Sequence, residues 1–168
     1  MPSVSGLSRD QRQQARRAVV RAALLGLSNP PETHYTQDAV QRWEGISKRR
    51  VAADGKCPNH SDCSSYATWC LWNGLQVGFG VGDVVNDLGW TAGYTGTMLN
   101  HGKPVRHVEN VKRGDCVLYG TGWPGKHVAI VVGRQDGVPM VVSHGSEEGP
   151  FLVRYDYRPD VIGFRRYI

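Results

Sequence analysis

Cys63 and His127 are the residues whose types and surroundings most clearly suggest chemistry. Cys63 follows Asp62, a residue that readily caps a helix, so we expect this cysteine in the first turn of a helix. The dipole and the free amide groups of a helix N-terminus stabilise a thiolate, the nucleophilic form of cysteine. His127 precedes the apolar residues 128–132, which predicts a position at the start of a β-strand. Together they predict nucleophilic catalysis by a Cys–His pair.

A second histidine is the candidate for a third catalytic member. His144 follows residues 138–143, so we expect it to close the next strand. If the two strands are neighbours, His144 would orient the ring of His127. The other cysteines and histidines singled out here are expected to be buried, structural or surface residues: Cys70, Cys116, His34, His101 and His107.

Cys57, His60 and Cys63 form a competing pattern with spacing suited to a metal ion. A structural zinc ion needs a fourth ligand and would occupy Cys63, and the sequence offers no obvious further pair of ligands. A disulfide between Cys57 and Cys63 is the other alternative, although four cysteines are too few for a disulfide scaffold at this length. We therefore expect neither a metal nor a cofactor.

Two helices are expected before the reactive cysteine. Ser8 and Gln11 form a capping box, and apolar residues follow at helical spacing as far as Gly26. Gly26 and the pair at residues 30–31, both prolines, should end this helix. A second, less regular helix is expected around residues 37–43.

The part of the chain after Cys63 changes from helical to strand patterns. A helix with one buried stripe should begin at Cys63 and end at Gly74. Short segments rich in Val, Ile and Tyr then predict an antiparallel meander, at residues 115–119, 127–133, 138–143, 152–157 and 161–168. Helices followed by a sheet predict an α+β fold, and 168 residues suit a single domain.

All of the net charge of +5 comes from the first third of the chain. Residues 1–56 hold 10 basic and 5 acidic side chains, whereas residues 57–168 hold 10 of each. The arginines of the first helix either form a solvated face or attract an anionic polymer. No nucleic-acid-binding motif accompanies them, so nucleic acid is not an expected partner.

Composition excludes several classes of protein. With 40% hydrophobic residues, the chain is not disordered by composition. No apolar run approaches the roughly 18 residues of a membrane-spanning helix, so we expect no membrane insertion. The N-terminus also lacks the uninterrupted apolar core of a secretory signal, which predicts synthesis in the cytoplasm without a signal peptide.

Four short motifs in a fixed order resemble those of the NlpC/p60 cell-wall peptidases, within the papain-like superfamily. They are DCSS at residues 62–65, VKRGDCVLY at 111–119, KHVAIVVG at 126–133 and VSH at 142–144. The related CHAP amidases share the same order of cysteine and histidine. Arg113 replaces the usual proline before Gly-Asp, Ala129 replaces a common glycine, and Ser65 stands where many members have glycine. Residues 143–150 look like the corresponding segment of actinobacterial phage endolysins.

The resemblance implies the papain-like NlpC/p60 fold, with N-terminal helices packed on a five- to six-stranded antiparallel sheet. Residues 1–53 would be a basic helical extension integral to the domain, and residues 54–168 the cysteine-peptidase core. Cys63 would be the nucleophile, His127 the general base and His144 the residue that orients it.

The resemblance also implies candidates for contacts with the substrate. Asp62 and Ser64, which flank the nucleophile, would contact the peptide. Tyr35 and Trp43 would face the cleft, and Trp123, in a glycine-rich loop before His127, would line it.

The function implied by the resemblance is peptidoglycan hydrolysis. The chain would cleave a peptide bond in the stem peptide or cross-link, as a monomeric phage lysin made in the host cytoplasm and acting on the wall after release. An N-acetylmuramoyl-L-alanine amidase or an acyltransferase on the same fold is an alternative. A non-catalytic module that binds the wall or nucleic acid is an alternative of a different class.

Overall fold

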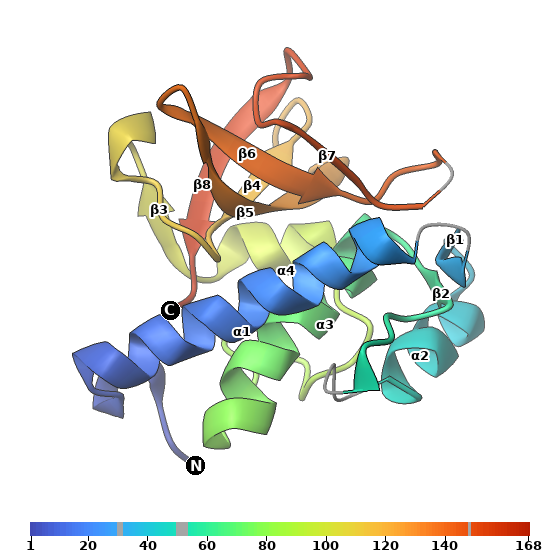
Figure 1. Cartoon of the computed structure of the whole chain (residues 1–168), viewed down its shortest axis with the longest axis horizontal. Helices are drawn as coiled ribbons and strands as arrows, with labels where there is room; N and C mark the ends of the chain where they lie inside the picture. The colour runs from blue at the N-terminus through green and yellow to red at the C-terminus, as the bar shows by residue number, and fades with distance from the viewer. Residues whose placement is uncertain (30–31, 50–53, 148) are drawn as a thin grey trace.

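Helices lie against one face of an antiparallel β-sheet in the computed structural model, which describes residues 1–29, 32–49, 54–147 and 149–168 (Figure 1). The helices are α1 (Arg9–Ser28), α2 (Ala39–Ser47), α3 (Cys63–Trp72) and α4 (Thr95–Asn100), with helical turns at Val4–Gly6, Asn73–Val77 and Val108–Asn110. The strands are β1 (His34–Tyr35), β2 (His60–Ser61), β3 (Lys103–Val105), β4 (Cys116–Tyr119), β5 (His127–Gln135), β6 (Val138–Ser143), β7 (Phe151–Arg154) and β8 (Val161–Arg166). The α+β fold class expected from the sequence is confirmed.

The starts of the first two helices follow local capping chemistry. At α1 the capping box is present: the Ser8 amide donates to Gln11 Oε1 at 2.8 Å, and the Gln11 amide donates to Ser8 Oγ at 3.1 Å. Asp38 caps α2, which covers Ala39–Ser47 rather than residues 37–43. The prolines expected to end α1 and the boundary expected after residue 53 lie outside the described residues.

Helix α3 is buried on every side, because α1 and β5 pack against it (Figure 1). All ten of its residues are buried, which is more than the single stripe expected from the sequence. A helix that is apolar all round belongs in the interior of a domain. Within the described ranges, no helix combines the length and the apolar character needed to cross a membrane.

Gly26 and Gly74 are not helix stops, so both of these expectations were wrong. Helix α1 continues to Ser28, and Gly74 lies within the helical turn that extends α3. A Cβ atom at Gly26 would collide with the hydroxyl of Tyr66, which accepts a hydrogen bond from the Gly26 amide at 3.1 Å. A Cβ atom at Gly74 would collide with Val19 of α1. Both glycines therefore permit the close packing of α1 on α3.

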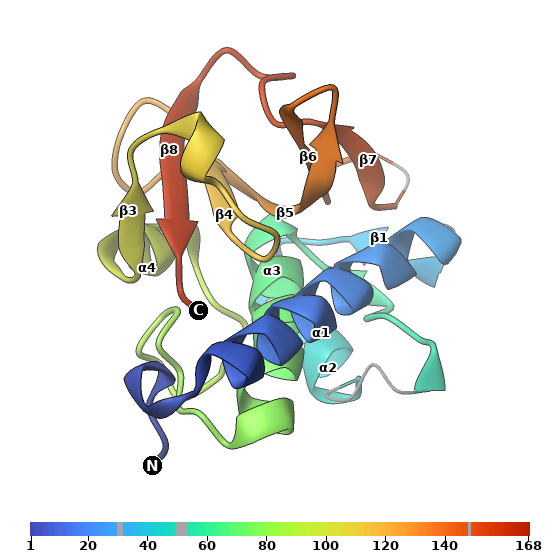
Figure 2. The same ribbon diagram turned by 60° about the vertical axis from the view of Figure 1, so that its left-hand side comes forward.

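The main sheet has the strand order β3-β8-β4-β5-β6-β7. Strands β4 to β7 form the expected antiparallel meander. Strand β8 does not extend that meander but returns to lie between β3 and β4 (Figure 2). Strand β7 ends at Arg154, before the expected end at residue 157, because the chain turns there and the Tyr157 amide donates to the Arg154 carbonyl at 3.2 Å.

The two faces of the sheet bury different sets of side chains. Val128 and Ile130 of β5 pack into the core shared with the helices, whereas Ala129 and Val131 belong to a second apolar cluster. This alternation follows from the two-residue period of a strand. It continues through β6, so adjacent residues at the end of that strand point to opposite faces.

A buried carboxylate joins α1 to the sheet. Asp115, just before β4, is fully buried and accepts hydrogen bonds from Arg166 at 2.7 and 2.9 Å and from Arg16 at 3.2 Å. The backbone amide of Lys112 adds a hydrogen bond of 2.8 Å. Arg16 also bonds the backbone oxygen of Ile168. One arginine of the basic helix is therefore an internal structural group.

Replacing Asp115 with alanine should lower the free energy of unfolding by about 3 kcal/mol, because it leaves two partly buried guanidinium groups without their shared anion. Urea unfolding followed by circular dichroism measures this loss. The matched control is Asp156→Ala, which removes an exposed partner of Arg154 and should change stability little. Equal losses in the two variants would contradict the structural role of Asp115.

Candidate active site

Cys63 is the first residue of α3, as its sequence context predicts. The Asp62 side chain accepts a hydrogen bond from the Ser65 amide at 2.8 Å, and Ser65 Oγ accepts one from the Asp62 amide at 2.9 Å. This capping box fixes the direction in which the chain enters the helix. The Cys63 sulfur lies against the start of β5, where the backbone amide of Val128, next to His127, hydrogen-bonds to it.

Arg42 of α2 holds the residues that flank Cys63. Its Nε lies 3.0 Å from Asp62 Oδ2, and its guanidinium donates to Ser64 Oγ at 3.0 Å and to the Gly93 carbonyl at 2.7 Å. Ser64 Oγ in turn donates to Asp62 Oδ1 at 3.0 Å. Asp62 and Ser64, which were expected to contact a substrate, are therefore both bonded to other groups within the protein. Arg42 belongs to no recognisable motif, so sequence analysis missed it.

Burial decides the protonation state of Cys63. Desolvation and the neighbouring Asp62 charge raise the pKa of its thiol to about 12, although the amides of Val128 and Ser64 and the charge of Arg42 act in the opposite direction. The helix N-terminus expected to stabilise a thiolate is present, but the hydrogen bonds of the backbone amides lower the pKa of the thiol less than burial raises it. Cys63 is therefore a neutral thiol near pH 7 in this structure.

His127 begins β5, as predicted, and its ring is held by a chain of hydroxyl groups. Its Nε2 lies 2.7 Å from Ser143 Oγ, which lies 3.0 Å from the hydroxyl of Tyr157. The ring also contacts Tyr119, at 5.6 Å between centroids. Ser143 and Tyr157 were not among the expected site residues, since only the pairing of β5 with β6 and the turn after β7 bring them here.

His144 does not orient His127, and this part of the expected triad is corrected by the geometry. The Nε2 atom of His144 lies 3.1 Å from the Ser61 carbonyl of β2, and its Nδ1 has no hydrogen-bond partner among the described residues. Its ring packs between Tyr35 and Tyr66, at 5.6 and 5.4 Å. The reason is strand alternation: the side chain after Ser143 must point to the helix side of the sheet.

The His127 imidazole is also neutral near pH 7. Burial, the charge of Arg158 and the neighbouring His144 lower its pKa to about 4, while Asp160 and Asp62 oppose the shift. A neutral imidazole can accept a proton, whereas an imidazolium cannot. In this state the thiol of Cys63 and the imidazole of His127 are both uncharged.

A polar pocket of about 440 Å³ opens beside His127. Tyr35 lines it, together with Lys126, Glu147 and Arg158. Burial raises the pKa of Tyr35, and the charges of the nearby Cys63 and Asp62 raise it further. The expectation that Tyr35 faces a cleft therefore agrees with its position.

The two tryptophans expected in the cleft lie elsewhere. Trp43 stacks on Trp72, which stacks on Trp90, at centroid distances of 6.3 and 6.0 Å. Trp123 is 67% exposed in the β4–β5 loop, and its indole donates to the Gly96 carbonyl at 3.2 Å. Neither residue lines the pocket beside His127.

The competing metal pattern does not assemble in the part of the chain that the structure describes. No three His, Cys, Asp or Glu side chains there are arranged to hold a metal ion. Cys57 and Cys63 are both free thiols, and Cys57 Sγ lies 2.7 Å from the hydroxyl of Thr33. His60 instead packs its ring 5.6 Å from His34 across the parallel β1–β2 pair, a pairing that the sequence did not predict.

This fold is similar to those of solved NlpC structures. The chain aligns with NlpC2 of Trichomonas vaginalis over 89% of its length, with a TM-score of 0.56 and 16% sequence identity. It aligns with NlpC1 of the same organism over 89% of its length, with a TM-score of 0.54 and 17% identity. It spans 47% and 44% of those two chains, or about half of each. A Bacillus cereus NlpC/P60 family protein matches 63% of this chain and 31% of its own at 20% identity, with a TM-score of 0.44.

Comparisons of the sequence alone give no match to a protein-family model and no similar curated protein. The structural similarity establishes the fold, which is the α+β NlpC/p60 fold implied by the four motifs. Because the sequence identities are only 16% and 17%, the similarity supports the fold and no further property.

Alkylation of Cys63 by iodoacetamide should accelerate steadily from pH 7 to beyond pH 9 without reaching a plateau. The reason is that a pKa raised to about 12 keeps the reactive thiolate fraction rising across this range. Peptide mapping by mass spectrometry gives the rate at each pH. Because burial also slows access of iodoacetamide to the thiol, the test depends on the shape of the pH profile rather than on the absolute rate. A plateau near neutral pH would show an activated thiolate.

Proposed function

We propose that this chain is a cysteine hydrolase that cleaves a peptide bond in the stem peptide or cross-link of bacterial peptidoglycan. The observation that carries the proposal is the position of Cys63 at a capped helix N-terminus, with its sulfur against the amide that follows His127. The NlpC/p60 fold supports the same reading, since the motifs that resemble this family of cell-wall peptidases fall on these elements.

The proposed reaction starts from a neutral pair. Cys63 Sγ attacks the scissile carbonyl carbon while His127 takes the thiol proton, so no free thiolate is needed beforehand. The backbone N–H of Cys63, at the start of α3, is placed to stabilise the developing oxyanion. His127 then gives the proton to the leaving amine, and water hydrolyses the resulting thioester to regenerate the thiol. No cofactor takes part.

The pocket beside His127 suits a zwitterionic peptide. Lys126 supplies positive charge for a carboxylate and Glu147 supplies negative charge for an amino group, whereas Arg158 is already paired with Asp160 at 2.8 Å. Stem peptides carry both kinds of group. This complementarity favours a peptide substrate over a bare glycan strand, which carries few such charges.

The biological setting that we propose is a monomeric phage lysin, made in the host cytoplasm and acting on the wall after release, with peptidoglycan as its partner. This setting rests on the resemblance of residues 143–150 to phage endolysins and is the most specific part of the proposal. An amidase or acyltransferase on the same fold is the principal alternative, since it would use the same Cys–His pair.

Cys63→Ala should abolish the clearing of a suspension of purified actinobacterial cell walls, because it removes the attacking sulfur. The matched control is Cys57→Ala, which removes a buried thiol outside the pocket and should retain lysis. Thermal unfolding of both variants verifies that they are folded. Lysis by folded Cys63→Ala would overturn the proposed mechanism.

The chemical groups released from digested walls distinguish the alternatives. New amino groups on diaminopimelate or on other stem-peptide residues indicate an endopeptidase, as proposed. Free lactyl carboxyl groups on muramic acid would indicate an amidase instead.

Ser143→Ala should lower the rate of wall lysis by about 10- to 100-fold, because His127 loses the hydrogen bond that fixes its ring. The acid limb of the pH–rate profile should also move, which a purely structural loss would not produce. Ser143→Thr keeps a hydroxyl and should restore part of the rate. If His144→Gln impairs lysis more than Ser143→Ala does, the orienting role belongs to His144 after all.

A further inference from the structure

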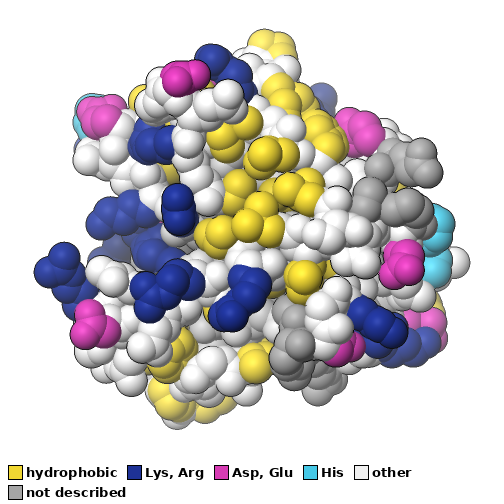
Figure 3. Space-filling view, viewed as in Figure 1, with side chains coloured by type: hydrophobic (Ala, Val, Ile, Leu, Met, Phe, Trp, Pro, Cys, Tyr) yellow, Lys and Arg dark blue, Asp and Glu magenta, His cyan; other side chains and the backbone are white. Residues whose placement is uncertain are grey.

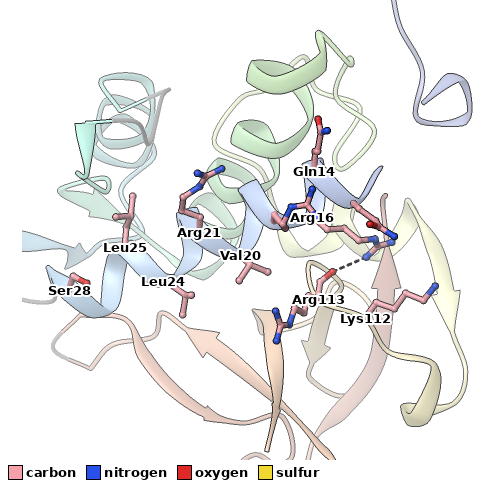
Figure 4. A pocket seen from close by; sticks show the side chains of 11 residues that line it. Gln14, Arg16, Val20, Arg21, Leu24, Leu25, Ser28, Lys112 and Arg113 are labelled. Atoms are coloured by element: carbon pink, nitrogen blue, oxygen red, sulfur yellow. Dashed lines mark hydrogen bonds between the residues drawn. The ribbon is translucent and has the colours of Figure 1, made fainter. Parts of the chain in front are cut away.

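A groove runs along α1, away from the candidate active site, with a cavity volume of about 940 Å³ (Figure 4). One wall is α1 itself, and the other includes Lys112 and Arg113 of the loop before β4. Arg16 joins the walls, since its guanidinium donates to the Arg113 carbonyl at 2.9 Å. This groove shares no lining residue with the pocket beside His127, so the proposed hydrolysis leaves it unexplained.

The floor of the groove is apolar. Val20 and Leu24 project from the side of α1 that faces the sheet, toward the side on which Arg113 lies (Figure 4). Leu24 is 39% exposed. In the space-filling view, hydrophobic side chains gather in the middle of this face, with Lys and Arg side chains along its lower left (Figure 3). Exposed apolar side chains in a groove bordered by polar ones are typical of an interaction site.

Four cations at this groove lack an internal partner. Among the described residues, no acceptor lies within hydrogen-bonding or ion-pair distance of the side chains of Arg17, Arg21, Lys112 and Arg113. Among the described residues, no acidic side chain lines the groove. Arg16, by contrast, is bound to Asp115. Part of the basic excess of the first third of the chain is therefore concentrated at an apolar groove, where no described residue neutralises it.

We propose that this groove docks an acidic amphipathic segment of a partner protein. Apolar side chains of the segment would cover Val20 and Leu24, and its carboxylates would pair with the four cations. This is the recognition mode of a helix in a groove. The lining residues span positions 13 to 28 of α1, a length of about 22 Å that matches a helix of about fifteen residues.

Other anionic partners fit the groove less well. A nucleic acid would find no aromatic side chain on which to stack a base, because none of the described residues that line the groove is aromatic. A wall polymer with phosphate or carboxylate groups alone would leave the apolar floor unused. A lipid bilayer is flat, whereas this floor lies between two walls.

The test uses a fluorescein-labelled peptide of about fifteen residues, with leucines along one helical face and glutamates along the other. Fluorescence anisotropy with the full-length chain should show saturable binding that weakens, but persists, at high salt, because the apolar contact is not screened. A scrambled peptide of the same composition should bind much more weakly.

Arg17→Glu combined with Arg21→Glu should weaken binding of this peptide by about tenfold or more, and Leu24→Asp should weaken it independently. The matched control is Arg106→Glu, which reverses a surface charge outside the groove and should leave the affinity unchanged. Cys63→Ala should also bind normally, so this test stands apart from that of the proposed hydrolysis.

Three results would overturn the proposal. The first is equal affinity for hexaglutamate, which has no apolar face and would reveal a general polyanion site. The second is binding to phosphatidylglycerol vesicles without binding to the peptide, which would identify a membrane surface. The third is an equal loss of affinity in Arg106→Glu, which would show attraction by net charge alone.

Discussion

The burial of α3 on every side is the constraint on which the rest of the structure depends. This helix can be enclosed only if α1 approaches it closely, and Gly26 and Gly74 make that approach possible. The sheet closes the other side through the apolar side chains of β5. Because the enclosed helix begins at Cys63, the same packing that stabilises the domain also fixes the sulfur against the start of β5.

Enclosure of Cys63 has a chemical consequence. It excludes water from Cys63 and His127 and moves both groups toward their neutral forms, with pKa values near 12 and 4. Position at a helix N-terminus therefore does not suffice to produce a thiolate, since desolvation at this depth raises the pKa of the thiol more than the hydrogen bonds of the backbone amides lower it. In the proposed reaction, the substrate carbonyl would meet an uncharged pair formed by Cys63 and His127. Charge separation, with its energetic cost, would then occur during the attack rather than before it.

The arginines of α1 lie in two different environments. Arg16 turns inward and neutralises the buried Asp115, which ties α1 to β4 and β8. Arg17 and Arg21 remain outside, beside the exposed Leu24 and the partly buried Val20 of the groove. The net charge counted from composition cannot distinguish these two environments, because identical side chains on one helix differ only in the direction that they face.

The sequence by itself determined what depends on neighbouring residues: the cap that places Cys63 at a helix start, the strand that begins at His127, and the meander of β4 to β7. Tertiary structure decided what depends on distant residues. Strand register gave the hydrogen bond of His127 to Ser143 rather than to His144, because alternate side chains of β6 face opposite sides of the sheet. Tertiary packing placed Arg42 beside Asp62 and made Gly26 and Gly74 points of close contact between helices. The sequence could not predict these contacts, because no local pattern specifies which surfaces will meet.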